Sequence, residues 1–191
     1  MTTLNSLQDL ADEDTHDFLT LGFEPTSTAR IIDLPTPKLE LDFRLIVQLE
    51  PKISVGQTPF GHRNWIAFSS GQWVAKWGKG VVVPGGQDSQ IVTPTLSTSV
   101  ATNYLLQTSD DPPAYIAVQT SGWRTGPPEV LSKLFNPDEA DKVSPYEYRF
   151  RISIRLETGD ERLGGKLNEG MWIGSGARLG NEVVYDAYRI L

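Results

Sequence analysis

The sequence YEYRFRISIRLE, residues 146–157, decides the fold class of this chain. Apolar and aromatic side chains occupy its even-numbered positions: Tyr146, Tyr148, Phe150, Ile152, Ile154 and Leu156. Polar side chains occupy its odd-numbered positions: Glu147, Arg149, Arg151, Ser153, Arg155 and Glu157. Successive side chains of a β-strand point to opposite faces, so this alternation predicts a strand with one apolar and one polar face. The polar face meets solvent in a sandwich, whereas in a barrel that holds a ligand it could line a polar lumen.

Further stretches after residue 37 have the same β-branched and aromatic character. They are LELDFRLIVQLEPKISVG, NWIAFSSGQWVA, KGVVVPGG, ATNYLLQTS, PAYIAVQTSGWR, GMWIGSGARLG and NEVVYDAYRIL. Turn-forming residues separate them: Gly71, Pro84-Gly85-Gly86, Asp110-Asp111-Pro112-Pro113, Gly159-Asp160, Gly164-Gly165 and Gly180-Asn181. The stretch GPPEVLSKLFN, residues 126–136, predicts one short helix, because prolines precede apolar residues at helical spacing. Eight or so short strands joined by tight turns predict an antiparallel β-barrel or sandwich.

Residues 1–37 differ from the rest in charge. They hold seven acidic residues and one arginine, so six of the seven net negative charges of the chain lie here. Apolar residues between Leu4 and Leu21 fall partly at helical spacing, and three prolines follow. We therefore predict an acidic N-terminal extension over residues 1–37, either with one short helix or as an unstructured tail, and a β-domain over residues 38–191.

Composition excludes several classes of protein. The chain has 191 residues, a net charge of −7 and a pI near 4.8, which argues against a nucleic-acid binder. It has no cysteine and two histidines, so a disulfide scaffold, a thiolate metal site and a cysteine nucleophile are excluded, and no metal site is predicted. Neither a membrane-spanning apolar run nor a secretory signal is present. We expect a cytoplasmic protein with no membrane partner.

Several motifs in order resemble one known family. TPFGHR, GQW, VVVPGGQDSQ, NYLLQTSDD, SGWRTGPPEVL, YEYRFRISIRLETG and KLNEGMWIGSG resemble, over about residues 38–190, the family called domain of unknown function 3237, or UPF0311-like. The resemblance implies a single-domain, mainly β, calycin-like antiparallel barrel that forms a homodimer or small homo-oligomer. Most members of the family have no assigned activity. Some fungal members act in secondary metabolism as cofactor-free cyclases.

The fungal branch implies a definite reaction. Its members close an oxygen heterocycle by intramolecular hydroalkoxylation, in which a phenol O–H adds to a prenyl alkene. We accordingly predict a cofactor-independent cyclase whose partner is an aromatic polyketide, with no cofactor. The alternative is a calycin-like carrier that binds a small molecule without chemistry.

Three residues are predicted to be catalytic. Asp88 follows a Pro-Gly-Gly turn and could act as a general acid whose pKa is raised by burial; the alternative is an Asp that caps its own turn. Arg124 could clamp a carbonyl or phenolate oxygen, or it could bind strand-end carbonyls. Glu157 and Arg151 are expected to point into the lumen, because the resembled family has Glu and Arg at the matching positions. The alternative is that both lie on a solvated face.

Further residues are predicted to bind the substrate through aromatic faces, cations or hydrogen bonds. They are Arg63, Trp65, Tyr104, Trp123, Tyr148, Arg151, Lys166 and Asn168. Lys166 and Asn168 are expected at the start of a strand after Gly164-Gly165. Two tryptophans usual in the family are replaced by Ser89 and Lys166. This difference predicts a wider or more polar lumen that accepts a bulkier substrate, such as a tricyclic aromatic.

Overall fold

The computed structural model describes residues 22–136 and 138–191. Residues Lys38–Leu191 form one compact unit. Before it, the described part of the chain contains one short helix, α2 (Thr28–Ile31), whose N-terminus is capped by the Ser27 hydroxyl. The stretch from Leu4 to Leu21, for which we predicted either a short helix or an unstructured tail, lies outside the described residues. None of the described helices is long and apolar enough to cross a membrane.

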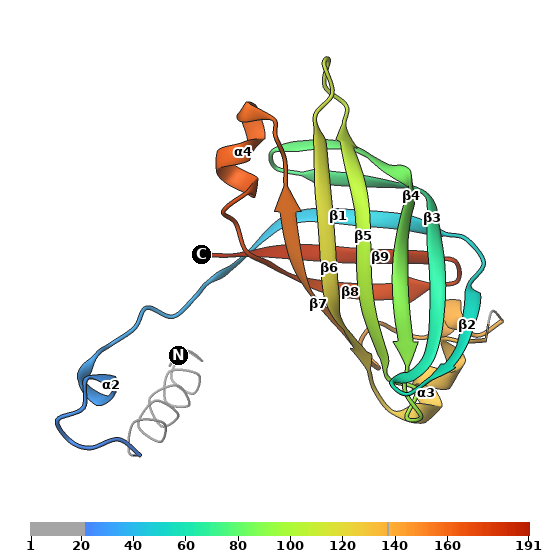
Figure 1. Ribbon diagram of the computed structural model, residues 1–191, viewed down its shortest axis with the longest axis horizontal. Helices are drawn as coiled ribbons and strands as arrows, with labels where there is room; N and C mark the ends of the chain where they lie inside the picture. Colours follow the sequence, from blue (N-terminus) through green and yellow to red (C-terminus); the bar gives the residue numbers. More distant parts are fainter. Residues whose placement is uncertain (1–21, 137) are drawn as a thin grey trace, which may run out of the picture. The chain divides into compact units, whose positions relative to one another are not determined.

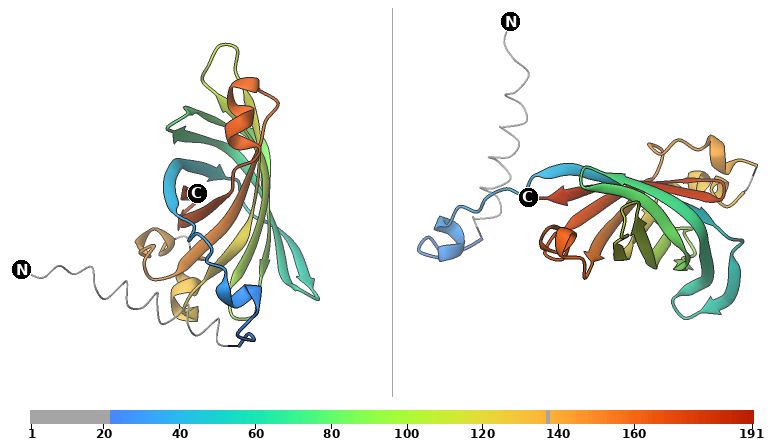
Figure 2. Two further views of the ribbon diagram at one scale, coloured as in Figure 1. Left: turned by 90° about the vertical axis from the view of Figure 1, so that its left-hand side faces the viewer. Right: turned by 90° about the horizontal axis from the view of Figure 1, so that it is seen from above.

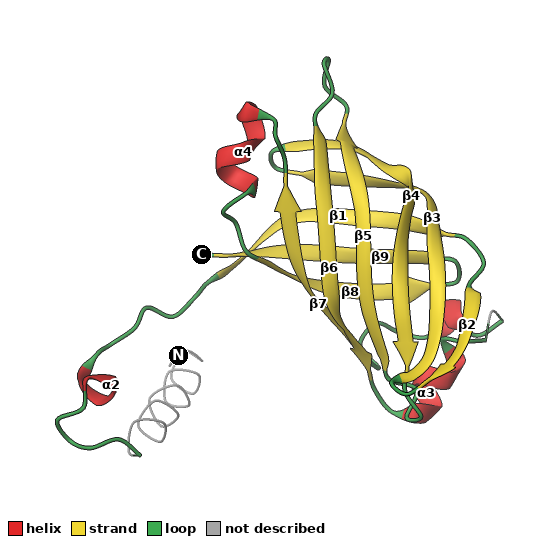
Figure 3. Cartoon of the chain, viewed as in Figure 1, coloured by secondary structure: helices red, strands yellow, loops and turns green. Residues whose placement is uncertain are grey.

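Nine antiparallel strands build the compact unit (Figures 1 and 3). Their bounds are β1 (Leu39–Leu49), β2 (Ile53–Thr58), β3 (Gly61–Ala75), β4 (Gly78–Val92), β5 (Thr98–Thr108), β6 (Tyr115–Thr125), β7 (Arg149–Glu157), β8 (Trp172–Leu179) and β9 (Glu182–Ile190). Their order in the sheet is β1-β9-β8-β7-β6-β5-β4-β3-β2, and a further pairing of β1 with β3 closes eight of them into a barrel. The prediction of a mainly β antiparallel barrel is confirmed.

The closed sheet curves around its own apolar face. In Figure 1, β4, β5 and β6 lie in front of β1, β8 and β9, which run in a crossing direction, and Figure 2 shows this curvature from two other sides. Every second residue of β7 is buried, from Phe150 to Leu156, whereas Arg151 and Glu157 are exposed on the outer wall. Our prediction that Arg151 and Glu157 line the lumen is therefore wrong. The apolar face of β7 takes the interior because burying those charges would cost far more than burying isoleucine.

The glycine motifs in β3 and β4 form bulges inside long strands, not turns between strands. The β3–β4 register shifts between Ala67 and Gln72, and the β4–β5 register shifts between Val83 and Gln87. A Cβ at Gly86 would lie 2.3 Å from the Cβ of Tyr104, so glycine is needed where these strands approach closely. Such bulges bend a strand and redirect the side chains that follow, here Asp88.

A buried carboxylate ties together one end of the barrel. Asp42 of β1 accepts hydrogen bonds from the indole nitrogens of Trp77, at 3.1 Å, and Trp172, at 2.8 Å. The rings of Trp73 and Trp77 pack with a centroid distance of 4.9 Å, and Phe43 meets Trp77 edge to face. These contacts fill that end with aromatic side chains.

Short helices lie at both ends of the barrel. The predicted helix after β6 is confirmed as α3 (Pro128–Lys133); with the 3₁₀ turn η1 (Ala140–Lys142), it buries Leu131, Leu134 and Ala140. Helix α4 (Glu161–Leu167) lies at the opposite end (Figure 1) and was not predicted, because Gly164-Gly165 indicated a turn. Its N-cap Asp160 accepts a hydrogen bond from the Arg162 backbone N–H at 2.9 Å, which offsets the low helix propensity of two glycines.

Two glycine substitutions should change stability in opposite directions. Gly86→Ala should destabilise the barrel by about 1–3 kcal/mol, because the new methyl group overlaps Tyr104. Gly165→Ala should stabilise it by up to about 1 kcal/mol, because α4 is helical there and no atom lies within 4 Å of the added Cβ. Urea unfolding measures both changes. Equal stability of the Gly86→Ala variant and the wild type would contradict the close approach of β4 and β5.

Candidate functional site

A chamber lies inside the barrel. Its volume is about 40 Å³. Seven apolar residues line it: Val47, Leu49, Phe68, Val100, Phe150, Ile152 and Val183. The polar residues of the wall are Asp88, Gln90, Thr102, Tyr104, Thr120, Arg124, Arg178 and Tyr185. The interior is thus not filled by aliphatic side chains, since a carboxyl group and two guanidinium groups face the same space.

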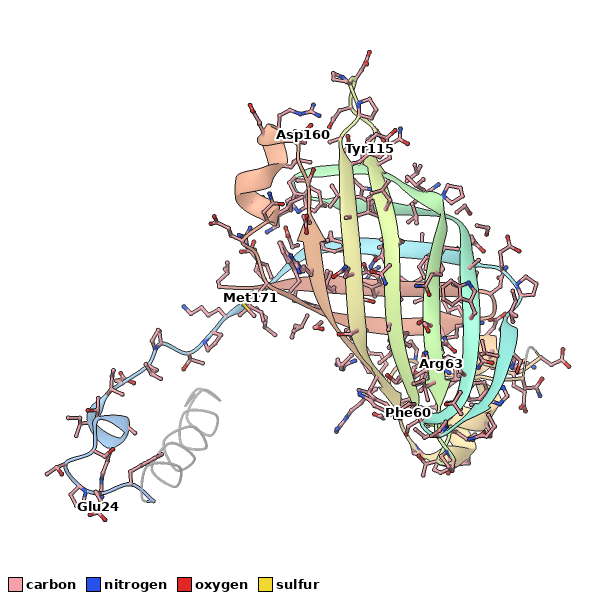
Figure 4. The ribbon with its side chains drawn as sticks, in the orientation of Figure 1. Glu24, Phe60, Arg63, Tyr115, Asp160 and Met171 are labelled. Carbon is pink, nitrogen blue, oxygen red and sulfur yellow. The ribbon has the colours of Figure 1, made fainter. Side chains whose placement is uncertain are left out.

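A wider vestibule adjoins the chamber. It has a volume of about 520 Å³ and shares Leu49, Gln90, Arg124 and Arg178 with the chamber wall. Leu134, Phe135 and Ala140, from the segment of α3 and η1, line its other side. In Figure 4, the labelled Arg63 and Phe60 of the β2–β3 hairpin lie toward the α3 end of the barrel, whereas Tyr115 and Asp160 lie at the opposite end. A pocket of this volume is in the range that holds small-molecule ligands.

The chamber is smaller than the sequence predicted. A cavity that binds benzene measures about 150 Å³, so 40 Å³ admits a group of one or two carbon atoms and no aromatic ring. The predicted widening for a tricyclic substrate is therefore wrong for the chamber. Ser89 lies between the inward-facing Asp88 and Gln90 and points outward, and Lys166 lies on α4, so neither replacement of a tryptophan enlarges the lumen.

Asp88 is the carboxyl group of the chamber. It is 7% exposed and accepts hydrogen bonds from Gln90 Nε2, at 2.8 Å, and from the Ala101 backbone N–H of β5, at 3.1 Å. Asp88 therefore bonds to Gln90 and Ala101 and does not cap its own turn, which was the predicted alternative. Burial raises the pKa of Asp88 from 3.8 to about 6, although both hydrogen bonds and the charges of Arg124 and Arg178 act in the opposite direction.

Two arginines bring positive charge to the same chamber. Arg124 is 4% exposed, and its Nη2 donates to Thr98 Oγ1 at 3.1 Å. Its guanidinium carbon lies 5.1 Å from the ring centroid of Phe135. Burial lowers the pKa of Arg124 to about 10, so it remains protonated at neutral pH. Arg178 of β8 donates from Nε to the Gly180 carbonyl at 2.6 Å, and burial lowers its pKa too.

A pair of tyrosines adds neutral hydroxyl groups. The hydroxyls of Tyr104 and Tyr185 are hydrogen-bonded to each other across the barrel, from β5 to β9. Burial raises the pKa of both phenols, and the neighbouring ring raises that of Tyr104 further. Both tyrosines therefore remain neutral, and Tyr104, which we predicted as a binding residue, lines the chamber.

The other predicted binding residues lie outside the chamber. Trp65 and Trp123 are 43% and 49% exposed on the outer wall, where the strand alternation directs them. Arg63 also faces outward and donates to Ser89 Oγ at 2.7 Å. Arg151 donates to the Phe150 carbonyl, and Glu157 pairs with Arg155 at 3.3 Å, with both side chains exposed. These five residues do not line the lumen, so our prediction that they contact a ligand there is wrong.

The last three predicted binding residues are Lys166, Asn168 and Tyr148. Lys166 lies on α4 and Asn168 caps that helix, so neither begins a strand. The Asn168 amide accepts from the Thr158 backbone N–H at 2.8 Å and donates to the Thr158 carbonyl at 3.0 Å. Tyr148 is buried, and its hydroxyl accepts from the Arg178 backbone N–H at 2.9 Å, which helps to position Arg178.

The sequence analysis missed Gln90, Arg178 and Tyr185. Gln90 and Tyr185 share the inward face of their strands with Asp88 and Ala187, so alternation counted from a known inward residue could have found them. Arg178 lies at the end of the glycine-rich strand β8, where alternation is hard to read. Among the described residues, no group of three or more His, Asp or Glu is arranged to hold a metal ion.

The fold and the site define a class: a closed antiparallel β-barrel whose interior chamber is lined by a buried acid and two arginines. Residues 37–190 match the family described as "Protein of unknown function (DUF3237)", and the chain belongs to that family. A UPF0311 protein of Rhodopseudomonas palustris (strain TIE-1) is 31% identical over 157 residues, which cover 82% of this chain and 99% of the relative.

Solved structures share the barrel. A conserved protein of unknown function from Rhodopseudomonas palustris aligns with a TM-score of 0.74 at 30% identity, covering 83% of this chain and 100% of that one. A β-barrel-like protein from Acinetobacter baumannii aligns with a TM-score of 0.70 at 33% identity, covering 83% and 99%. An enzyme from Penicillium herquei aligns with a TM-score of 0.60 at 20% identity, covering 84% and 100%, and shares the fold.

Removing the buried charge should stabilise the barrel at neutral pH. The folded protein holds the Asp88 proton more tightly than the unfolded chain, so wild-type stability falls as pH rises from about 4 to 6. The difference between 3.8 and about 6 corresponds to about 3 kcal/mol. Asp88→Asn should therefore be more stable than wild type by up to this amount above pH 7, and the gain should vanish toward pH 4.

Urea unfolding across this pH range measures the effect. Asp110→Asn, in the exposed β5–β6 hairpin, is the matched control and should change stability by less than about 0.5 kcal/mol. An Asp88→Asn variant that is less stable than wild type at pH 7.5 would show that the carboxylate is stabilised by its surroundings.

Proposed function

We propose that this protein is a cofactor-independent cyclase that adds a phenol O–H across a prenyl alkene in fungal aromatic polyketide biosynthesis. The observation that carries the proposal is Asp88, a buried carboxyl group with a pKa of about 6 beside two arginines in an apolar chamber. Membership of the family supports this reading, since its fungal branch is expected to include such cyclases. The similar fungal barrel from Penicillium herquei is described as an enzyme.

Asp88 supplies the proton in this mechanism. A carboxyl group with a pKa of about 6 remains protonated in about a tenth of molecules at pH 7, far more than an ordinary aspartate. The acid gives its proton to the less substituted alkene carbon, and the π electrons form the new C–H bond. Positive charge develops on the more substituted carbon, near the rings of Phe68, Phe150 and Tyr185.

The phenol oxygen then closes the ring. One of its lone pairs forms the C–O bond to the cationic carbon, and its proton returns to the Asp88 carboxylate. Arg124 and Arg178 stabilise negative charge on the phenol oxygen as its proton leaves. Substrate and product are isomers, so the reaction consumes no oxidant, reductant or second substrate.

The two cavities suit the two parts of such a substrate. The chamber of about 40 Å³ accepts the end of an alkene, and the vestibule of about 520 Å³ accepts fused aromatic rings. Arg124 and Arg178 line both spaces, so they lie where the phenol oxygen would enter. In this proposal the acid acts on the alkene and the cations act on the oxygen.

Turnover of a synthetic substrate tests the proposal. The probe is a hydroxynaphthalene with an ortho 1,1-dimethylallyl group, because its alkene end is small and ring closure creates one stereocentre. Wild-type protein should form one enantiomer, and Asp88→Asn should lower kcat/KM by at least about 100-fold with little change in binding. Chiral chromatography and calorimetry measure the two effects.

The control is again Asp110→Asn, which should retain full turnover. The wild-type rate should fall as pH rises above about 6, because the acid form of Asp88 is the reactive one. A racemic product that forms equally fast without protein would contradict the cyclase. Binding of the probe without turnover, in both wild type and Asp88→Asn, would indicate a carrier.

A further inference from the structure

The two arginines of the chamber have no acidic partner in the described part of the chain. The guanidinium group of Arg124 donates to the Thr98 hydroxyl at 3.1 Å, and that of Arg178 donates to the Gly180 carbonyl at 2.6 Å, so both acceptors are neutral. The ion pairs that the described residues form include neither arginine. Buried charges are normally paired, because their loss of water is costly. A group from outside the described chain is therefore expected to balance these two cations.

The chamber keeps a positive charge in both states of Asp88. Asp88 is the one acidic residue among the described residues of the wall, which also contains Arg124 and Arg178. The wall therefore carries one net positive charge when Asp88 is ionised and two when it is protonated. Burial, and after it the charge of Arg178, lowers the pKa of Arg124, so the two cations repel each other. An anion near both of them would relieve this repulsion.

Hydroxyl groups of the wall can donate hydrogen bonds to such an anion. Tyr104 and Tyr185 share one hydrogen bond, and Thr102 and Thr120 share another at 2.7 Å. Each pair has two O–H protons and uses one of them between its members. Within the described residues, these four hydroxyls make no other hydrogen bond. Each pair can therefore donate one further hydrogen bond to an ion in the chamber, which all four residues line.

The size of the chamber selects a small ion. Its volume of about 40 Å³ exceeds the roughly 10–15 Å³ that one water molecule requires. A halide ion is only slightly larger than a water molecule and fits, whereas an organic anion such as gluconate does not. The ion would enter through the vestibule, which shares Arg124 and Arg178 with the chamber and adds the cation of Lys52.

We propose that the chamber is a binding site for one small monovalent anion of halide size, held by Arg124, Arg178 and the hydroxyl pairs of the wall. The ion occupies the chamber when no organic ligand fills it. It supplies the counter-charge that the described chain does not give to the two arginines. The site goes beyond the proposed function, because binding of the ion requires no proton transfer from Asp88.

Binding of the anion is coupled to the charge of Asp88. The charged and titratable groups that line the chamber with this carboxyl are Arg124 of β6, Arg178 of β8, Tyr104 of β5 and Tyr185 of β9. Near pH 6 the arginines stay protonated and the tyrosines stay neutral, so Asp88 is the group that changes charge. Its protonation removes the repulsion between carboxylate and anion, so the ion binds more tightly below about pH 6. By reciprocity, the bound ion raises the pKa of Asp88.

Thermal unfolding of the full chain in sodium chloride and in sodium gluconate tests the site. The two salts are compared at equal ionic strength, since only chloride fits the chamber. At about pH 5.5, wild-type protein should melt at least about 3 °C higher in chloride, and at about pH 8 this gain should be less than half as large. Bromide should act like chloride. Equal melting temperatures in chloride and gluconate at about pH 5.5 would overturn the proposal.

Three variants separate the site from a general effect of salt. Arg178→Gln removes one of the two cations and should abolish the gain in chloride, whereas Arg149→Gln, on the exposed face of β7, should retain it. Asp88→Asn leaves two net positive charges on the wall at every pH, so its gain should be equal at about pH 5.5 and pH 8. An undiminished gain in Arg178→Gln would overturn the site. A pH-dependent gain in Asp88→Asn would overturn the coupling to Asp88.

The titration of Asp88 in wild-type protein gives a test that holds even if Arg178→Gln does not fold. Followed by nuclear magnetic resonance, its midpoint should lie at least about half a pH unit higher in chloride than in gluconate, because the bound ion favours the protonated acid. The same midpoint in both salts would contradict an anion beside Asp88. Neither measurement uses an alkene, so an effect of chloride without turnover of the prenylated probe would support the anion site and reject the cyclase.

Discussion

The carboxyl group of Asp88 and the guanidinium groups of Arg124 and Arg178 lose most of their water when the barrel closes around them. Water would otherwise stabilise these charges by far more than the few hydrogen bonds that replace it. The result is opposite in sign for the two kinds of group: the pKa of the acid rises and the pKa of each base falls. The same burial therefore creates the polar reaction site and lowers the stability of the folded barrel.

The rest of the barrel keeps these groups in place. At one end, Asp42 accepts hydrogen bonds from two indole nitrogens, and the rings of Trp73 and Trp77 pack closely. Toward the other end, the bulge at Gly86 directs Asp88 inward, and Tyr148 holds the backbone of Arg178. Among the described residues, three buried side-chain atoms have no hydrogen-bond partner: Asn64 Oδ1, Gln87 Oε1 and Arg124 Nε.

The β-barrel could be predicted from the sequence because alternation over residues 146–157 and turn chemistry are local signals. Asp88, Arg124 and Tyr104, three of the predicted site residues, line the chamber, since each lies on an inward position of its strand. Alternation alone says that the two faces of β7 differ, and it leaves open which face is inside. Arg151 and Glu157 were placed on the wrong side because resemblance was preferred to the cost of burying charge.

Features that depend on contacts between distant strands were not predictable in the same way. Tryptophan often binds aromatic ligands, so Trp65 and Trp123 were candidates by residue type. Only the register of β3 and β6 shows that they face outward. The Pro84–Gly86 motif has the composition of a turn, and its role as a bulge depends on Tyr104 of the next strand. Likewise, Arg178 joins the chamber because closure of the barrel brings β8 to face β4 and β6 across the interior.

A titration of the Asp88 carboxyl carbon by nuclear magnetic resonance tests the central claim most directly, with Asp88→Asn used to assign the signal. The account predicts a midpoint near pH 6, because burial in the apolar chamber outweighs the hydrogen bonds and the two arginines. A midpoint at or below pH 4 would contradict it, since Asp88 would then be an ordinary stabilised carboxylate and not an acid poised to give up a proton.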